Sequence, residues 1–338
     1  MSKTSISVIG AGSWGTALSL HLARIGHKVN LWVYEKLLCE QIKETKENPI
    51  FLPGFNLSNL IYPTNSLEEA IGENNVILVV VPTSFIRNIA EMMAPLLNPD
   101  SVIINAGKGI ETNSLCIIRE IFKQTLSPTC RFATLSGPTF ATEVARGEPS
   151  AIVAASEEIN VSNQVKTFFS SPSLKVFTSD DPIGVEIGGA LKNVMAITTG
   201  ISDGLKMGHN TRAAIITRGL VEITRIGTAL GAKPETFSGL SGLGDLVLTC
   251  TGELSRNRQY GIRVGQGEKP HEITNNKVAV EGIFTLKSAH ALISKLNIQA
   301  SIIDETYKVV YKAKSPHQAL KDLMQSKTTT EFVGIKGM

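Results

Sequence analysis

A glycine-rich turn near the amino end constrains the fold of this chain more than any other feature. Residues 5–18 read SISVIGAGSWGTAL, in which an apolar strand runs to Ile9 and an apolar helical pattern follows the last glycine. Gly10 permits a tight turn, Gly12 leaves the backbone open to a pyrophosphate, and Gly15 lets the helix pack closely on the strand. The first N–H groups of the helix then face the phosphates. The spacing, in this context, predicts a dinucleotide-binding turn.

Apolar runs after this turn predict an α/β domain with a parallel sheet. These runs lack the alternation of a half-exposed strand, which favours strands covered on both faces. Two of the runs lead into Gly107-Lys108-Gly109 and Ser136-Gly137-Pro138-Thr139, at strand ends where open parallel sheets bind ligands. We expect strands at residues 6–9, 28–34, 75–81, 101–106, 132–135, 151–155 and 174–178.

The hydrophobic period becomes helical after Ser179-Asp180-Asp181-Pro182. We therefore expect a dinucleotide-binding domain of the Rossmann type at 1–182 and an all-α substrate and catalytic domain at 183–338. A glycine-rich stretch at 239–258 is expected to form a loop with a binding role. The insert at 44–62 is compatible with a lid or with packing. The expected helices are 185–201, 211–230, 285–296, 302–312 and 316–325.

Composition narrows the function classes. A length of 338 residues suggests about two domains, and 42% hydrophobic with 19% charged residues is typical of a soluble globular protein. The net charge of +3 is spread along the chain, which argues against a nucleic-acid partner. No apolar run reaches the roughly 20 residues of a spanning helix, so stable membrane insertion is not expected.

The cysteines and histidines indicate neither disulfides nor a metal site. Four cysteines lie far apart without a CxxC spacing, and six histidines lack ligand spacing, so no metal is expected. Reduced thiols favour a cytoplasmic location. Apolar helix faces in the second domain are compatible with a homodimer.

Lys192 and Asp245 are candidates for acid–base chemistry. Lys192 lies among small apolar residues, where desolvation and a nearby cation such as Lys108 would lower its pKa from about 10.4 towards 7 to 8. It would then be a proton donor at neutral pH, and the alternative is a snorkelling lysine on an amphipathic helix. Asp245 follows closely spaced glycines and could hold the Lys192 ammonium, while its alternative is a helix N-cap.

Two further basic segments suit phosphate or nicotinamide. Arg256-Asn257-Arg258 offers guanidinium forks for phosphate, and its alternative is a solvated helix face. Lys108, flanked by glycines at a strand end, is directed towards nicotinamide and substrate.

The longer motifs together resemble the bacterial NAD(P)-dependent sn-glycerol-3-phosphate dehydrogenases. The resemblance covers nearly the whole chain and is carried by GAGSWGTAL at the start, NAGKGIE around Lys108, LSGPTFATEVARG from Leu135, IGGALKNVMAI around Lys192 and GLGDLVLTCTGELSRNRQYG from Gly242.

The resemblance implies a Rossmann domain joined to a helical domain, and the reversible reduction of dihydroxyacetone phosphate to sn-glycerol 3-phosphate for glycerophospholipid synthesis. By the family pattern Lys192 is the catalytic acid/base, Lys108 contacts substrate and cofactor, and Asp245 with Thr249 organises the site. The substrate, a small phosphorylated triose, would also meet Gly137, Thr139, Ser255, Arg256 and Asn257. The cofactor positions are Ser13, Trp14, Tyr34, Ala141, Arg256, Ala279 and Glu281, with Lys108 and the turn glycines Gly10, Gly12 and Gly15.

The chain departs from this family at the second strand. The bacterial enzymes often carry His or Arg there to meet the 2′-phosphate of NADPH, whereas this chain has Tyr34-Glu35-Lys36. A carboxylate at that distance from the glycines is typical of NAD enzymes, so the choice between NADPH and NADH stays open.

Two rival readings remain at this level. A β-hydroxyacid dehydrogenase would place Asn four residues after the lysine, where this chain has Ala196. A catalytically silent NAD(P) sensor would leave Lys108, Lys192 and Asp245 without a purpose.

Overall fold

The computed structural model describes residues 4–274, 280–325 and 331. They form two compact units: one comprises residues 1–107 and 118–182, and the other 108–117 and 183–338 within those described. The second unit thus includes a short piece, 108–117, that the expected boundary at 182/183 assigns to the first domain.

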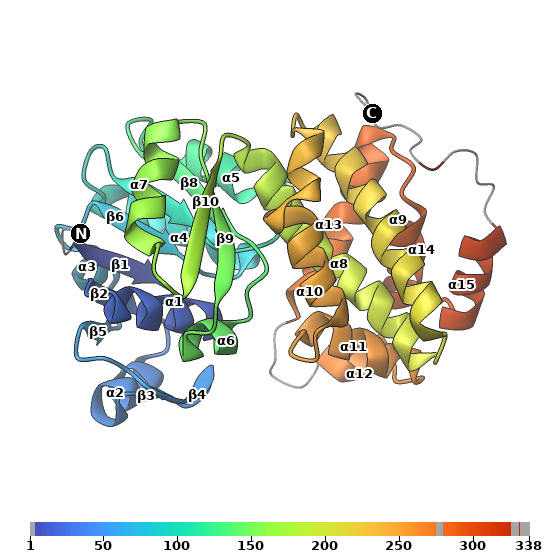
Figure 1. The fold of residues 1–338 in the computed structure, drawn as a ribbon, viewed down its shortest axis with the longest axis horizontal. Coiled ribbons are helices and arrows are strands. Elements are labelled where there is room, and N and C mark those ends of the chain that lie inside the picture. The colour runs from blue at the N-terminus through green and yellow to red at the C-terminus, as the bar shows by residue number, and fades with distance from the viewer. Residues whose placement is uncertain (1–3, 275–279, 326–330, 332–338) are drawn as a thin grey trace. The chain divides into compact units, whose positions relative to one another are not determined.

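The first unit is built on an eight-stranded sheet in the order β10-β9-β8-β7-β6-β1-β2-β5 (Figure 1). Its pairings are parallel except that of β8 with β9, which is antiparallel. The strands are β1 (Ser5–Ile9), β2 (Lys28–Trp32), β5 (Ile61–Thr64), β6 (Val76–Val79), β7 (Val102–Asn105), β8 (Arg131–Ser136), β9 (Ser150–Ala155) and β10 (Leu174–Ser179).

Helices cover this sheet on both faces. Successive side chains of a strand point to opposite faces, and in β1 Val8 joins the core with Leu18 and Phe169, while Ser7 donates a hydrogen bond to the Ala70 carbonyl. The helices of this unit are α1 (Ser13–Arg24), α2 (Lys36–Thr45), α3 (Leu67–Ile71), α4 (Thr83–Met93), α5 (Ile118–Thr125), α6 (Ala141–Arg146) and α7 (Ile159–Phe169), with a 3-10 turn at Ala94–Leu96 and a small hairpin of β3 (Glu47–Asn48) and β4 (Leu52–Asn56).

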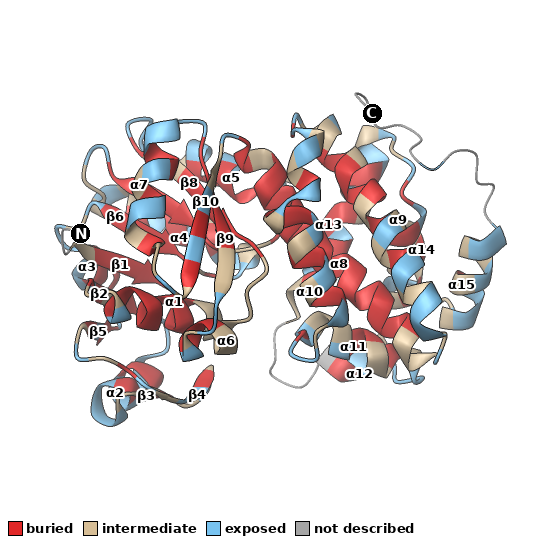
Figure 2. Cartoon of the chain, viewed as in Figure 1, coloured by how far each residue is buried: buried red, intermediate tan, exposed pale blue. Residues whose placement is uncertain are grey.

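The regular secondary structure of the second unit is helical within its described residues, apart from an isolated bridge between Ile110 and Ile117. Figure 2 shows α8 buried along nearly its whole length. The helices are α8 (Pro182–Gly204), α9 (Gly208–Ala229), a 3-10 turn at Pro234–Ser238, a π-helical turn at Leu240–Gly244, α10 (Asp245–Thr251), α11 (Arg256–Gly265), α12 (Pro270–Thr274), α13 (Glu281–Leu296), α14 (Ser301–Tyr311) and α15 (Pro316–Gln325).

The segment 108–117 is part of the core of this second unit. Ile110 and Ile117 belong to the same buried cluster as Leu191 of α8 and Leu286 of α13. The Ser288 hydroxyl donates to the Ile110 carbonyl at 2.9 Å. The packing therefore holds the segment that begins with Lys108 against α13.

Candidate active site

Lys192 lies in the middle of α8 and is only 7% exposed. Its Nζ donates to Asp245 Oδ1 at 2.6 Å and to Thr249 Oγ1 at 2.7 Å. Burial lowers the pKa of Lys192 to about 8; the Asp245 charge opposes that shift, and the Lys108 charge adds to it. The alternative of a snorkelling lysine is therefore wrong, because Nζ is held by Asp245 and Thr249 and the side chain is only 9% exposed.

Asp245 bridges two lysines from separate parts of the chain. Its side chain is fully buried, and Oδ2 accepts from Lys108 Nζ at 2.5 Å while Oδ1 accepts from Lys192. Asp245 is the first residue of α10, but the N-cap is Gly244 and the Asp245 side chain makes no cap. The N-cap alternative is thus wrong. The glycine-rich stretch is also not one loop, since a π-helical turn and α10 lie within it.

Thr249 completes this cluster from one turn further along α10. Its hydroxyl donates to the Asp245 carbonyl at 2.6 Å and accepts from Lys192. Two ammonium groups and one carboxylate leave a net positive charge in a largely buried place. Such a charge stabilises an anionic oxygen that forms beside it, because little water is present to screen the interaction.

Asn193 is a residue of this site that sequence reasoning missed. Its Oδ1 accepts from Asn257 Nδ2 at 3.0 Å, and Asn257 Oδ1 accepts from the Gly282 N–H at 2.9 Å. The Asn257 amide is therefore held in one orientation. Only adjacency to Lys192 could have pointed to Asn193 in the sequence.

Arg256 and Glu281 begin two helices near the lysines. Arg256 is the exposed first residue of α11, and its guanidinium makes no hydrogen bond or ion pair with any part of the chain that the structure describes. Burial raises the pKa of Glu281, and the charges of Arg256, Lys108 and Lys192 oppose that shift. Lys108 and Lys192 are both paired with Asp245, so Arg256 is the one of these three cations whose side chain remains available to an anionic ligand among the described residues.

Ser255 and Arg258 have structural partners. The Ser255 hydroxyl caps α11 by accepting from the Arg258 N–H at 3.2 Å. The Arg258 guanidinium is paired with Asp203 at 2.7 Å. Of the run Arg256-Asn257-Arg258, which was expected to bind phosphate, the Arg258 side chain is therefore engaged by Asp203 instead.

The first unit contains the glycine turn, and its geometry suits a dinucleotide. Gly10 has φ +114°, and a Cβ on Gly15 would lie 1.9 Å from the Gly10 carbonyl oxygen, so the turn needs glycine at both places. A Cβ on Gly12 would meet nothing within 4 Å, which leaves open space beside the backbone. The first turn of α1 has no side-chain cap, and Trp14 Nε1 is buried without a partner among the described residues. These donors and this space fit a pyrophosphate.

The insert at 44–62 fastens this turn. Asn48 is fully buried and donates to the Ala11 carbonyl at 2.8 Å and to Thr16 Oγ1 at 2.9 Å. The Ser13 hydroxyl donates to the Phe51 carbonyl at 2.6 Å. Of the two roles left open for the insert, these contacts support packing.

The remaining predicted positions of the first unit lie at strand ends and helix starts. Tyr34 is 71% exposed just after β2, where the Asn65 amide donates to its carbonyl. Ala141 is the first residue of α6. Gly137 follows β8, and its carbonyl accepts from Thr139 Oγ1 at 3.2 Å. The predicted cofactor residue Ala279 lies outside the described residues.

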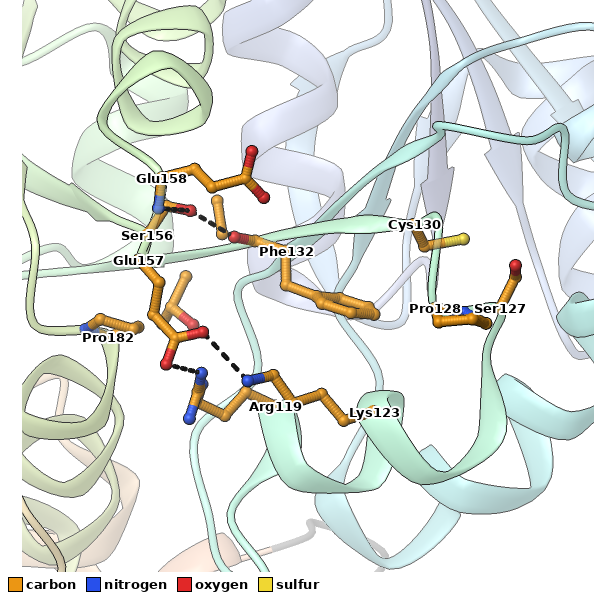
Figure 3. Close-up of a pocket in the computed structure, with 12 residues that line it drawn as sticks. Arg119, Lys123, Ser127, Pro128, Cys130, Phe132, Ser156, Glu157, Glu158 and Pro182 are labelled. Carbon is orange, nitrogen blue, oxygen red and sulfur yellow. Dashed lines mark hydrogen bonds and ion pairs between the residues drawn. The ribbon is translucent and has the colours of Figure 1, made fainter.

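A pocket of about 360 Å³ in the first unit contains none of these residues. Figure 3 shows the Glu157 carboxylate between Arg119 and Lys123, with ion pairs of 2.5 and 3.0 Å. The Ser156 hydroxyl of this pocket also has a partner, because it donates a hydrogen bond to the Phe132 carbonyl. The cations of this pocket thus already have an anionic partner.

The described residues contain no group of three or more His, Cys, Asp or Glu side chains placed to hold a metal ion. None of their helices is both long and apolar enough to cross a membrane.

Comparison with known proteins places the chain beside one group of enzymes. Residues 5–162 match the family model described as NAD-dependent glycerol-3-phosphate dehydrogenase N-terminus, and residues 181–321 match the C-terminus model of the same name. A relative from Geobacter metallireducens named glycerol-3-phosphate dehydrogenase (NAD(P)+) is 48% identical, over 94% of this chain and 96% of its own.

Solved structures agree with this match. A glycerol-3-phosphate dehydrogenase from Coxiella burnetii is 38% identical with a TM-score of 0.92, covering 96% of this chain and 99% of its own. A yeast enzyme of the same name is 25% identical with a TM-score of 0.82, covering 96% of this chain and 100% of its own.

Proposed function

The chain belongs to the family of NAD-dependent glycerol-3-phosphate dehydrogenases, and we propose that Lys192 is the acid that completes its reaction. The enzyme is an NAD(P)-dependent oxidoreductase that interconverts dihydroxyacetone phosphate and sn-glycerol 3-phosphate. When bound, the nicotinamide cofactor supplies the hydride that attacks the ketone carbon. Negative charge then develops on the ketone oxygen, and Lys192 Nζ stabilises that oxygen and transfers a proton to it.

The observation that carries this proposal is the environment of Lys192 Nζ. Asp245 and Thr249 hold it at 2.6 and 2.7 Å, and burial lowers its pKa to about 8. A lysine with that pKa keeps its proton at neutral pH but releases it more readily than a surface lysine. Asp245 keeps Lys108 in the same place, which gives the developing oxyanion a second cation.

The phosphate of the substrate is assigned to the amino end of α11. Arg256 offers there a guanidinium fork for which the described residues provide no hydrogen-bond or ion-pair partner, and Asn257 presents an amide that Asn193 orients. Ser255 contributes through the cap that it makes in α11. Gly137 and Thr139 are the further positions assigned to the substrate, and Ala141 is assigned to the cofactor. Thr249 holds the lysine rather than the substrate.

The dinucleotide is assigned to the glycine turn of the first unit. Gly10, Gly12 and Gly15 shape the turn, and Ser13 and Trp14 begin the helix behind it. Tyr34 lies at the end of β2, where the adenosine ribose of a dinucleotide is held in this class of fold. The further positions assigned to the cofactor are Lys108, Arg256, Ala279 and Glu281.

Substitution of Lys192 tests the proposal. We expect Lys192→Ala to abolish turnover while the dissociation constant for NADH, measured by fluorescence quenching, changes little. Lys287→Ala, on a different helix, is the matched control and should keep normal turnover. Unchanged turnover in Lys192→Ala would remove this residue from the mechanism.

A cytoplasmic homodimer that supplies glycerophospholipid synthesis is the remaining part of the proposal. Four free cysteines, three of them buried, support a reducing compartment. Exposed Leu243, Val247 and Leu254 near α10 support self-association. Sedimentation velocity of the purified protein tests the dimer, and a single species at the mass of one chain would refute it.

A further inference from the structure

Asp203 joins two arginines from different helices at the end of α8. Its Oδ1 accepts from Arg212 Nε at 2.9 Å and Nη2 at 2.6 Å, and its Oδ2 accepts from Arg258 Nε at 2.8 Å and Nη2 at 2.7 Å. The Asp203 and Arg258 side chains are only 10% and 12% exposed. Both carboxylate oxygens are therefore occupied by charge-assisted hydrogen bonds that solvent screens weakly.

Helices α8 and α11 touch backbone to backbone in the same region. A Cβ on Gly200 would lie 2.1 Å from the Arg258 carbonyl oxygen, and a Cβ on Gly261 would lie 2.1 Å from the Ile197 carbonyl oxygen. Glycines allow this close approach, but they offer no side chains that interdigitate and resist sliding. The ion pair of Arg258 with Asp203 supplies a directional contact that the glycines lack.

Arg258 lies in the first turn of α11, together with Arg256. Arg258 is two residues from Arg256, for which the described residues provide no hydrogen-bond partner, so the position of the Arg256 backbone follows that of the helix. Asn257, in contrast, is tied independently to Asn193. We propose that Asp203 is a positioning residue for the substrate phosphate, which holds Arg258 and thereby places Arg256. This inference rests on the phosphate role proposed for Arg256.

Asp203→Asn tests the inference through two substrates that differ only in phosphate. Dihydroxyacetone phosphate uses the phosphate contact, and dihydroxyacetone does not. We expect Asp203→Asn to lower kcat/KM for dihydroxyacetone phosphate about tenfold, because small displacements of binding groups are costly to rate, and to leave kcat/KM for dihydroxyacetone unchanged. An equal loss with both substrates, or no loss with either, would overturn the inference.

Three further variants keep this test decisive. Arg258→Lys retains the charge with a single donor group, so it should fold and show a smaller loss of the same selectivity even where Asp203→Asn does not fold. Glu268→Gln removes an ion pair with Arg263 at the opposite end of α11 and should affect neither substrate. Arg256→Ala separates the two proposals. If it spares phosphate selectivity, the phosphate role proposed for Arg256 fails. If it loses that selectivity while Arg258→Lys and Asp203→Asn keep it, only the role of Asp203 is refuted.

Discussion

Lys192 can donate a proton only while its ammonium is charged, which makes the rate depend on pH. With a pKa of about 8, kcat/KM for ketone reduction should stay level below that pH and fall about tenfold per unit above it. The reverse oxidation needs the neutral amine, so its kcat/KM should fall below about pH 8. Rate profiles in both directions measure this, and a reduction rate that is flat from pH 7 to 10 would contradict the assignment.

The preference between NADH and NADPH should also depend on individual side chains. Glu35 follows Tyr34 at the end of β2, and its carboxylate would repel the 2′-phosphate of NADPH and accept from the ribose hydroxyl of NADH. We expect Glu35→Ser to raise the ratio of kcat/KM for NADPH to that for NADH about tenfold, since one favourable hydrogen bond and one repulsion are lost. Lys36→Ser removes a cation and should move the ratio in the opposite direction. An unchanged ratio in both variants would place the ribose elsewhere.

Individual side-chain pairings were predictable from the sequence only in part. The grouping of Lys192, Asp245 and Lys108 was predicted and is confirmed by their contacts. Asn48 and Asn193 were not, because the partner of a buried amide is set by segments far away in the chain, and neither residue lies in a pattern that a local rule recognises.

At the scale of elements, alanine substitutions at two glycines of the first turn should have different effects, one on cofactor binding and the other on the stability of the fold. A Cβ on Gly12 meets nothing within 4 Å, so Gly12→Ala should melt like the wild type but bind NADH more weakly, because the methyl group occupies the approach of the pyrophosphate. A Cβ on Gly15 would lie 1.9 Å from the Gly10 carbonyl oxygen, so Gly15→Ala should cost roughly 1–3 kcal/mol of stability. Thermal melts and cofactor titrations distinguish the two, and similar melts for both variants would contradict this account.

Most elements were predictable because their apolar periods are long. The expected helix at 316–325 coincides with α15, and that at 302–312 differs from α14 by one residue at each end. The strand β5 was missed, since its sequence IYPT contains a proline and is short. The antiparallel pairing of β8 with β9 could not be predicted either, because an apolar run indicates a strand but not the direction of the neighbouring strand.

For the whole molecule, the second unit should not be complete without residues 108–117. A fragment of 183–338 lacks Ile110 and Ile117, which are 2% and 4% exposed in its core. We expect this fragment to melt at a lower temperature than the intact chain and a peptide of residues 108–117 to raise that temperature, because burying the two side chains restores packing. A peptide carrying Ser at both isoleucine positions is the control. A fragment that melts like the intact protein would show that the boundary at 182/183 divides two independent domains.

The same segment sets an order of events during synthesis. Residues 108–117 are synthesised before α8, so Ile110 and Ile117 cannot be buried in the core of the second unit until its later helices have been made. The ammonium of Lys108 meets Asp245, 137 positions later, only when translation has passed α10. Every strand of the sheet precedes α8 in the chain, whereas the group of Lys108, Lys192 and Asp245 cannot form until α10 has been synthesised.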